Sequence, residues 1–185
     1  MSIIYTYIKA KLMKKVILAL AAAVIGLTSL SANAQNVMDR GANVVNVGVG
    51  LNSASSNNYF TVLGSWDYGV VGNLWDNRSA LSVGAQASFS TSEYVNGFSI
   101  GPTLGLHYHF VPQLDTYLRL MLGYKGWSYK DGRANDVANA VNVDRGGFGW
   151  NLALGTRYYF TQNFGLFLEV GYGISVANVG VSFKF

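Results

Sequence analysis

The sequence predicts an all-β fold: an eight-stranded antiparallel up-and-down transmembrane β-barrel, preceded by a cleaved signal peptide. Three observations carry this prediction. Apolar side chains alternate with small or polar ones from residue 43 onward, the alternating segments are about ten residues long, and short connections alternate with longer ones. Segments of about ten residues with this alternation are typical of tilted strands that cross a bilayer with one face toward lipid.

The N-terminal part, residues 1–34, predicts a signal peptide. Four lysines precede the apolar run at 16–27, and the small-residue sequence ANA follows it. This order is that of a secretory signal peptide, whereas a spanning helix needs about 20 apolar residues. A retained membrane anchor is the alternative. We expect cleavage near Ala34 and a barrel domain over residues 35–185, with Met13 as an alternative translation start.

Removal of the signal peptide changes the charge of the chain. The full sequence has 13 basic and 9 acidic residues, for a net charge of +4. The signal peptide holds four of the basic residues and none of the acidic ones, so nine of each remain and the mature chain is neutral. A nucleic acid or an anionic surface is therefore not an expected partner. The sequence has no cysteine, so an oxidising compartment would find nothing to crosslink.

The first half of the barrel is predicted from four segments. The first, 43–52, alternates valine with asparagine and glycine, and the second, 60–70, sets Phe, Val, Trp and Tyr against Thr, Ser, Asp and Gly. The third, 81–89, sets Leu, Val, Ala and Phe against Ser, Gly and Gln, and the fourth, 98–110, sets Phe, Ile, Leu and Tyr against Ser, Gly, Thr and two His. Pro102 falls on the apolar face of the fourth segment. We expect a bulge or local distortion there, because proline cannot donate to a strand ladder.

The second half follows the same pattern. The fifth segment, 118–125, sets Leu and Tyr against Arg, Gly and Lys, and the sixth, 148–160, sets Phe, Trp, Leu and Tyr against Gly, Asn and Arg. The seventh, 166–174, sets Leu, Val, Tyr and Ile against Glu and Gly. The eighth, 179–185, sets Val and Phe against Gly, Ser and Lys, and it ends on an aromatic residue.

The connections predict which end of the barrel faces which side. Outer-membrane barrels have short periplasmic turns and longer external loops. The short or moderate connections are 74–78, 111–115 and 161–163. The connections assigned to the outside are 53–58, 91–96, 128–146 and 175–177. An even number of strands then places both termini on the periplasmic side.

A soluble β-sandwich or a lipocalin-like barrel is the alternative fold. Its apolar face would point inward, but eight strands enclose only one layer of side chains or a small ligand. The large Leu, Phe and Trp residues share one face here, while Gly, Ser and Asn mostly share the other. Lipid suits the large set and a narrow lumen suits the small one. Leu63 and Phe167 are expected to point inward, which argues against a wide water pore.

The last two segments carry a resemblance to a known class. Over residues 155–185, GTRYYFTQNFGLFLEVGYGISVANVGVSFKF, the chain resembles small eight-stranded outer-membrane barrels of the OmpA/OmpX-like group. It resembles more closely the short, porin-like outer-membrane barrel proteins of the Bacteroidetes. In that group the barrel-insertion machinery reads a final strand that ends in an aromatic residue. The matching residues are Val179, Val181, Phe183 and Phe185.

The resemblance implies a location and a set of partners. The location is the cell outer membrane of a Gram-negative bacterium. The partners are outer-membrane lipid and, during biogenesis, the insertion machinery and periplasmic chaperones. The resemblance names no extracellular partner and no cofactor.

Charged residues on the small-residue face predict a polar network in the lumen. Pairing the strands about their turns places Arg119 near His107 and near Arg157, and it places Glu169 near Arg157 and Lys184. Buried charges occur in networks because an isolated one costs several kcal/mol. The predicted network consists of Asp67, His107, Arg119, Arg157, Glu169 and Lys184, with Tyr117 and Tyr159 filling space. Uncoupled side chains in lumen water are the alternative, because a strand register can slip.

The sequence favours no catalytic or metal site. His107 and His109 share a face, but no cysteine or clear carboxylate lies beside them in the predicted arrangement, so lumen packing is the favoured role. A Ser-His-acid site acting on lipid would need a histidine at the outer leaflet, and both histidines are expected inside, near the periplasm. We expect no enzyme.

The favoured function is a structural or surface-contact barrel, with adhesion or recognition through its external loops. The mixed-charge loop at 130–145 is the expected contact, although it is equally consistent with a solvated loop that has no partner. A narrow porin-like channel for small solutes is the alternative, and a lipid-modifying enzyme is the third function class.

Overall fold

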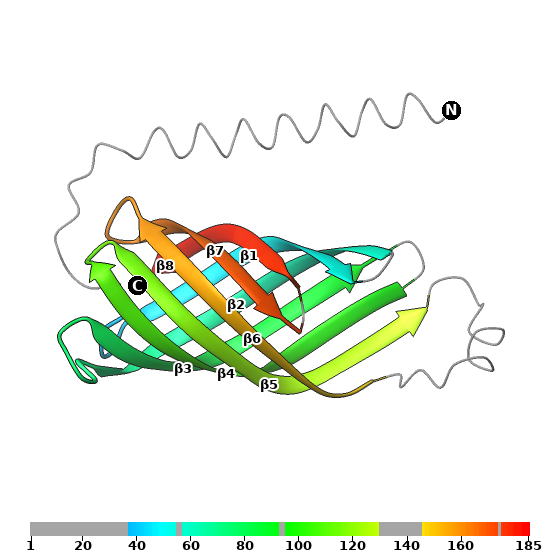
Figure 1. The fold of residues 1–185 in the computed structure, drawn as a ribbon, viewed down its shortest axis with the longest axis horizontal. Helices are drawn as coiled ribbons and strands as arrows, with labels where there is room; N and C mark the ends of the chain where they lie inside the picture. Colours follow the sequence, from blue (N-terminus) through cyan, green and yellow to red (C-terminus); the bar gives the residue numbers. More distant parts are fainter. Residues whose placement is uncertain (1–36, 55–56, 93–94, 130–145, 174) are drawn as a thin grey trace, which may run out of the picture.

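The chain folds into one closed barrel in the computed structural model (Figure 1). The described residues are 37–54, 57–92, 95–129, 146–173 and 175–185, with the side chains of 51–59 and 129 left out. The predicted signal peptide, its cleavage site and the loop at 130–145 lie outside these residues. Within the described ranges no helix is long and apolar enough to cross a membrane.

Eight antiparallel strands form the barrel, each hydrogen-bonded to the next in sequence and the last to the first. They are β1 (Asn43–Ala54), β2 (Asn57–Gly72), β3 (Ser79–Thr91), β4 (Val95–Val111), β5 (Leu114–Tyr129), β6 (Gly146–Tyr159), β7 (Phe164–Tyr172) and β8 (Ala177–Lys184). The predicted fold class is therefore confirmed. Several strands are longer than predicted, and β4 has 17 residues.

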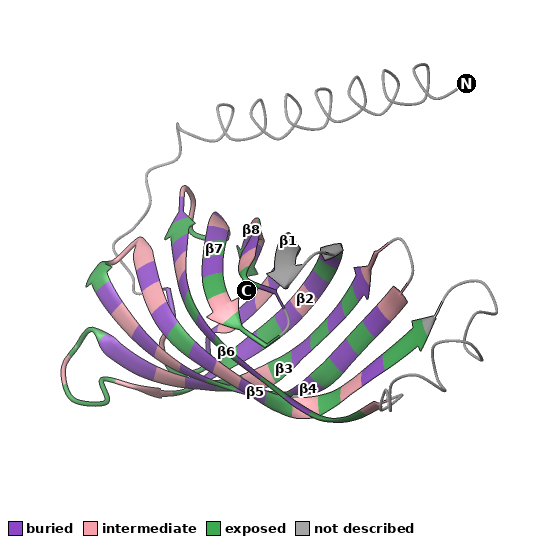
Figure 2. Cartoon of the chain, turned by 45° about the vertical axis from the view of Figure 1, so that its right-hand side comes forward, coloured by how far each residue is buried: buried purple, intermediate pink, exposed green. Residues whose placement is uncertain are grey.

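Burial alternates along each strand, which appears as stripes in Figure 2. Apolar side chains point outward and stay exposed: Ile100 is 55 % exposed and Leu154 is 54 % exposed. Polar side chains such as Asn46 and Ser82 point inward and are 0 % exposed. This arrangement inverts that of a soluble protein and is the one expected when hydrocarbon is the solvent outside.

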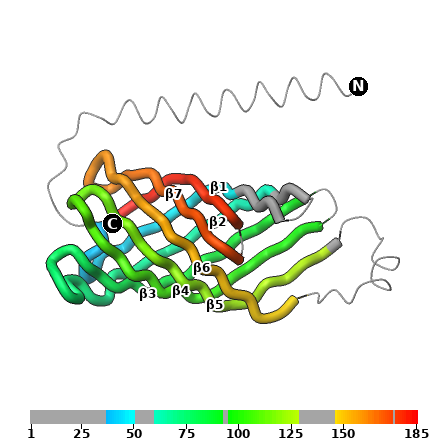
Figure 3. The backbone as a smooth tube through the Cα atoms, viewed as in Figure 1, coloured from blue at the N-terminus to red at the C-terminus, as the bar shows by residue number. Residues whose placement is uncertain are grey.

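The two barrel ends differ in their connections. The short-turn end is the end where residues 73–78, 112–113 and 160–163 join strands and where both described ends of the chain lie (Figure 3). The long-loop end is the opposite one. Ring pairs mark both ends of the outer wall, because aromatic residues favour the interfacial levels of a bilayer. Tyr108–Phe110 and Tyr158–Phe160 mark the short-turn end, and Phe98–Tyr124 and Trp150–Tyr172 mark the long-loop end.

Pro102 causes less distortion than a bulge. It lies on the outward face and remains paired with Ala85 of β3. The pairing of β4 with β5 is interrupted at Gly101 and Pro102 and resumes at Thr103 in the same register. Proline has no N–H to donate to β5, so pairing with that strand is lost locally, but β4 contains no extra residue as it would in a bulge. The register shifts of the described barrel occur elsewhere, between Gly69 and Val71 and between His109 and Val111.

A small apolar cluster closes the short-turn end. The segment before β1 lies in the barrel mouth, where Val37 and Met38 are buried. Together with Ala42, Val44, Ala80 and Tyr159 they form one cluster. The prediction placed Val44 on the inward face but did not place residues 37–42 in the lumen.

Candidate functional site

Two buried arginines lie at the centre of the lumen. Arg119 on β5 and Arg157 on β6 point inward, with side chains 1 % and 0 % exposed. Arg119 donates from Nη2 to Asp67 Oδ2 at 2.6 Å and from Nη1 to Glu169 Oε1 at 2.5 Å. Arg157 donates from Nη2 to the same Asp67 oxygen and from Nη1 to Asp115 Oδ2, the latter at 3.2 Å. These five residues, called the lumen network below, form a continuous chain of ion pairs from Glu169 to Asp115.

Tyr117 packs against both guanidinium groups. Its ring centroid lies 4.8 Å from Cζ of Arg119 and 4.2 Å from Cζ of Arg157, within the range of a cation–π contact. Its hydroxyl donates to Glu169 Oε1 at 2.7 Å. Gly155 lies opposite Tyr117 on β6, and a Cβ at Gly155 would lie 2.3 Å from the ring. The absence of a side chain at Gly155 therefore makes the space that the ring fills.

Neutral polar side chains connect the lumen network to the remaining wall. Asn46 on β1 donates to Ser65 Oγ at 2.8 Å and to Asp67 Oδ2 at 3.3 Å. On β8, Ser182 donates to Asn46 Oδ1, and Asn178 donates to Glu169 Oε2. These hydrogen bonds join neighbouring strands along the inner wall, β1 with β2, β8 with β1 and β7 with β8, as expected where buried polar groups must be satisfied.

His107 extends the network on the side of β3. Its Nδ1 lies 3.0 Å from both oxygens of Asp115, and its Nε2 lies 2.8 Å from Ser82 Oγ. The three side chains are thus connected in the order of a serine–histidine–aspartate triad. Ser82, His107 and Asp115 are, however, 0 %, 1 % and 0 % exposed, so the hydroxyl has no face open to a substrate.

His109 lies nearer the short-turn end, and its Nε2 is 3.6 Å from Asp115 Oδ1, so a carboxylate lies beside both histidines, contrary to the prediction. Its Nδ1 donates to the carbonyl of Arg78 at 3.0 Å, and its Nε2 accepts from the backbone N–H of Met38 at 3.0 Å. Both ring nitrogens are therefore occupied by hydrogen bonds. Among the described side chains, no three His, Cys, Asp or Glu residues are arranged to hold a metal ion.

The structure brings most of the predicted residues together. Asp67, His107, Arg119, Arg157 and Glu169 meet as described, and Tyr117 lies among them. Asp115 is a member that the prediction missed, because it was assigned to the turn at 111–115. Asp115 lies two residues before Tyr117 and four before Arg119 on β5, so the alternation could have placed its side chain on the same inward face.

Lys184 lies outside the network, and the predicted pairings were shifted. Lys184 pairs with Val44 at the short-turn end, while Glu169 pairs with Asn178. His107 lies opposite Tyr117 instead of Arg119, and Arg157 lies opposite Phe167 instead of Glu169. The bulge between His109 and Val111 and the tight turns shift the pairing of these strands by an even number of residues relative to the prediction. Each side chain therefore stays on its predicted face but has a different partner on the neighbouring strand.

The final strand closes the barrel. Val179, Phe183 and Phe185 are exposed on its outward face, Val181 is partly exposed, and the N–H of Phe185 donates to the carbonyl of Asn43 on β1. Phe183 also contacts the ring of Phe164, with centroids 5.4 Å apart. The alternating apolar stripe therefore lies at the seam of the barrel.

Comparison with known proteins gives a fold and no closer relationship. No protein-family model matches the sequence, and no curated protein matches it. The chain is similar to the outer membrane protein OprG from Pseudomonas aeruginosa, with a TM-score of 0.52 and 12 % identity over 83 % of this chain and 99 % of that one.

Two further solved structures share the fold. The N-terminal β-barrel domain of Pseudomonas aeruginosa OprF gives a TM-score of 0.50 and 18 % identity over 79 % of this chain and 98 % of that one. A structure from the de novo design of transmembrane β-barrels gives a TM-score of 0.50 and 20 % identity over 80 % of this chain and 98 % of that one. The chain therefore has the fold of small transmembrane barrels.

Proposed function

We propose that this protein is an integral outer-membrane β-barrel with a closed lumen, which acts through its long-loop end in surface contact and not as an enzyme. The observation that carries the proposal is the pairing of an apolar outer wall with a fully buried lumen network. An apolar wall of this kind is stable only against hydrocarbon. The fold shared with outer-membrane barrels of Pseudomonas aeruginosa supports the location.

The closed lumen argues against a permanent solute path. Arg119 and Arg157 are held by three carboxylates, and Leu63, Met121 and Phe167 are each buried in the barrel interior. Removing one partner of a buried ion pair typically costs about 3–5 kcal/mol, so thermal motion rarely opens such a barrier.

The long-loop end is the proposed contact surface. By the rule of short periplasmic turns, this end faces outward from the cell and the short-turn end faces the periplasm. The loop at 130–145 carries six charged residues and joins β5 to β6 at this end. Its proposed partner is a polar surface of another molecule or cell.

A narrow channel is the second candidate, and one observation favours it. Between the lumen network and the long-loop end, the lumen is lined by hydroxyl and amide groups. Gln86 and Thr103 are buried there, and their side-chain polar atoms make no hydrogen bond within the described protein. A hydrated half-lumen of this kind would suit small polar solutes if the network opened.

A deletion strain separates these functions. It would be complemented with the full chain or with a chain in which residues 131–144 are replaced by a short Gly-Ser linker. Loss of cell adhesion that only the full chain restores would support the proposal. Altered uptake of small solutes that both chains correct equally would support the channel, and altered lipid A would contradict the non-enzymatic assignment.

A further inference from the structure

Residues 37–42 occupy the mouth of the short-turn end without belonging to any strand. Val37, Met38 and Ala42 are 3 %, 1 % and 8 % exposed, and they pack on Val44, Ala80 and Tyr159. Each fully buried Val or Met side chain contributes about 1.5–3 kcal/mol relative to exposure. The segment is thus held in place by its own apolar side chains.

Three hydrogen bonds of its backbone fix the segment, one to a side chain and two to the backbone of β2. The N–H of Met38 donates to His109 Nε2 at 3.0 Å, and His109 is itself oriented by the carbonyl of Arg78. The N–H of Gly41 donates to the carbonyl of Gly69 at 2.8 Å, and the N–H of Gly69 donates to the carbonyl of Ala42 at 2.9 Å. All three bonds join the segment to β2 or β4.

The wall of the barrel is shaped to receive this segment. A Cβ added at Gly69 would lie 1.9 Å from the carbonyl oxygen of Asp39, and one at Gly72 would lie 2.0 Å from Asp39 Oδ1. Gly41 has a φ of 86°, a conformation that glycine adopts without strain, so the chain turns there into β1. Glycines on both sides of the contact therefore allow the close approach.

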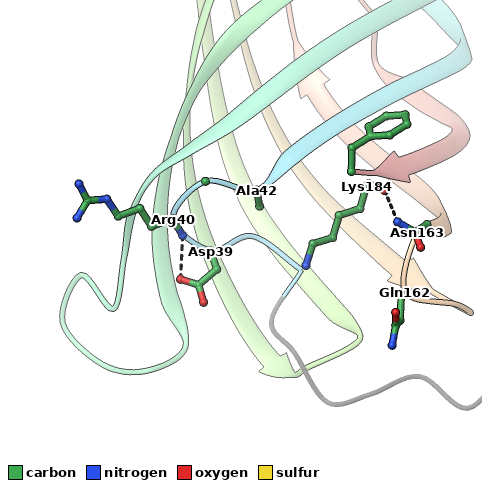
Figure 4. A pocket seen from close by; sticks show the side chains of 8 residues that line it. Asp39, Arg40, Ala42, Gln162, Asn163 and Lys184 are labelled. Atoms are coloured by element: carbon green, nitrogen blue, oxygen red, sulfur yellow. Dashed lines mark hydrogen bonds between the residues drawn. The ribbon is translucent and has the colours of Figure 1, made fainter.

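Space remains on the outer side of the segment. A pocket of about 390 Å³ lies between Asp39 to Ala42 on one side and Gln162, Asn163 and Lys184 on the other (Figure 4). Asn163 bridges to the carbonyl of Lys184 at 2.7 Å, so the far wall is formed by the β6–β7 turn and the end of β8. The pocket therefore borders the segment along residues 39–42.

We propose that residues 37–42 are a removable plug that controls solvent access from the short-turn end to the lumen below the lumen network. Two barriers then lie in series. The plug covers Ala80 and His109, and the lumen network separates them from Ser88 and Ser99 in the long-loop half. A segment outside the strand ladder can open locally while the rest of a protein stays folded. This inference goes beyond the closed barrel proposed above, because it makes one barrier independent of the other.

Cysteine labelling tests this inference, because the chain has no native cysteine. Ala80→Cys reports on the space behind the plug, and Ser99→Cys, whose position is 4 % exposed in the wild type, reports on the far side of the network. Each reporter is combined with Met38→Asp, which makes the buried plug residue charged, or with Gly69→Ala, which obstructs the seat. Arg40→Ser and Gly64→Ala are matched controls, because Arg40 is exposed and a Cβ at Gly64 meets only one atom, at 3.9 Å.

The rate of labelling by a charged maleimide is measured on the folded full-length mature protein in detergent micelles. We expect Met38→Asp and Gly69→Ala to raise the rate at the Ala80→Cys reporter at least about tenfold, which corresponds to about 1.4 kcal/mol of local opening. The controls and the Ser99→Cys reporter should keep their wild-type rates. Unchanged labelling at position 80 in both variants, an equal rise at both reporters, or failure of both variants to fold would each overturn the inference.

Discussion

Replacing Arg119 by methionine tests the lumen network at the cation that joins two of its carboxylates. The substitution keeps most of the side-chain volume and removes the guanidinium. Asp67 then still has Arg157, but Glu169 loses its cation and keeps only the Tyr117 hydroxyl at 2.7 Å and the Asn178 amide at 3.3 Å. Breaking one partner of a buried pair costs about 3–5 kcal/mol, and we expect a loss of unfolding free energy in that range.

A second substitution separates charge from packing. In the Arg119→Met background, Glu169→Gln removes the uncompensated carboxylate, so we expect it to restore about 1–3 kcal/mol, although the same change destabilises the wild type. Unfolding in urea is followed by tryptophan fluorescence of the protein in lipid vesicles and by the gel mobility of the folded form. Arg78→Met, at an exposed turn residue, is the control and should change stability by less than about 0.5 kcal/mol. The reasoning is refuted if Arg119→Met costs no more than Arg78→Met, or if the two network substitutions are additive.

Three other predictions have defined outcomes, two for substitutions and one for the wild-type protein. Gly155→Val should reduce the folded fraction on gels and destabilise the barrel by about 1–3 kcal/mol, since its side chain would meet the Tyr117 ring at 2.3 Å or less; an unaltered urea midpoint would count against the close packing of Tyr117 on Gly155. Phe183→Asp and Phe185→Asp should lower the amount of barrel in isolated outer membranes, because both replace an apolar ring on the outward face of the closing strand by a charge that is unfavourable against lipid; wild-type levels would contradict the role of that stripe. In planar bilayers the wild-type protein should conduct at background level, and regular conductance steps would contradict the closed lumen.

The faces of the strands could be predicted from the sequence, whereas the partners across strands could not. Alternation identifies which side chains point inward, so Asp67, Arg119, Arg157 and Glu169 were expected in the lumen. Pairing depends on where each turn begins, and the register shift between His109 and Val111 lies at the very end of the alternating segment, beside the turn. A shift by two residues preserves the face and changes the neighbour, which is why the predicted contacts of these side chains were wrong.

Lys184 and Asp115 illustrate the same limit. Lys184 lies on the predicted inward face of β8. Because Val170 pairs with Ala177, Phe183 pairs with Phe164, the first residue of β7, and Lys184 lies past the end of that strand, away from Glu169. Asp115 is of a residue type common in turns and was predicted in one, yet β5 begins at Leu114, one residue before it.

The plug had no usable signal at all. Its buried residues, Val37, Met38 and Ala42, precede the first alternating segment and follow no period. Their burial depends on glycines about 30 residues further along the chain.

The central claim is that the apolar face of the strands touches lipid while the charged face is sealed inside. Trp66 tests it most directly, because its ring lies on the outward face and is 45 % exposed. A variant that keeps Trp66 and has its other three tryptophans replaced by phenylalanine is folded into vesicles with brominated acyl chains. The account predicts strong quenching of Trp66 fluorescence relative to unbrominated vesicles. Unquenched fluorescence from the folded protein would contradict it.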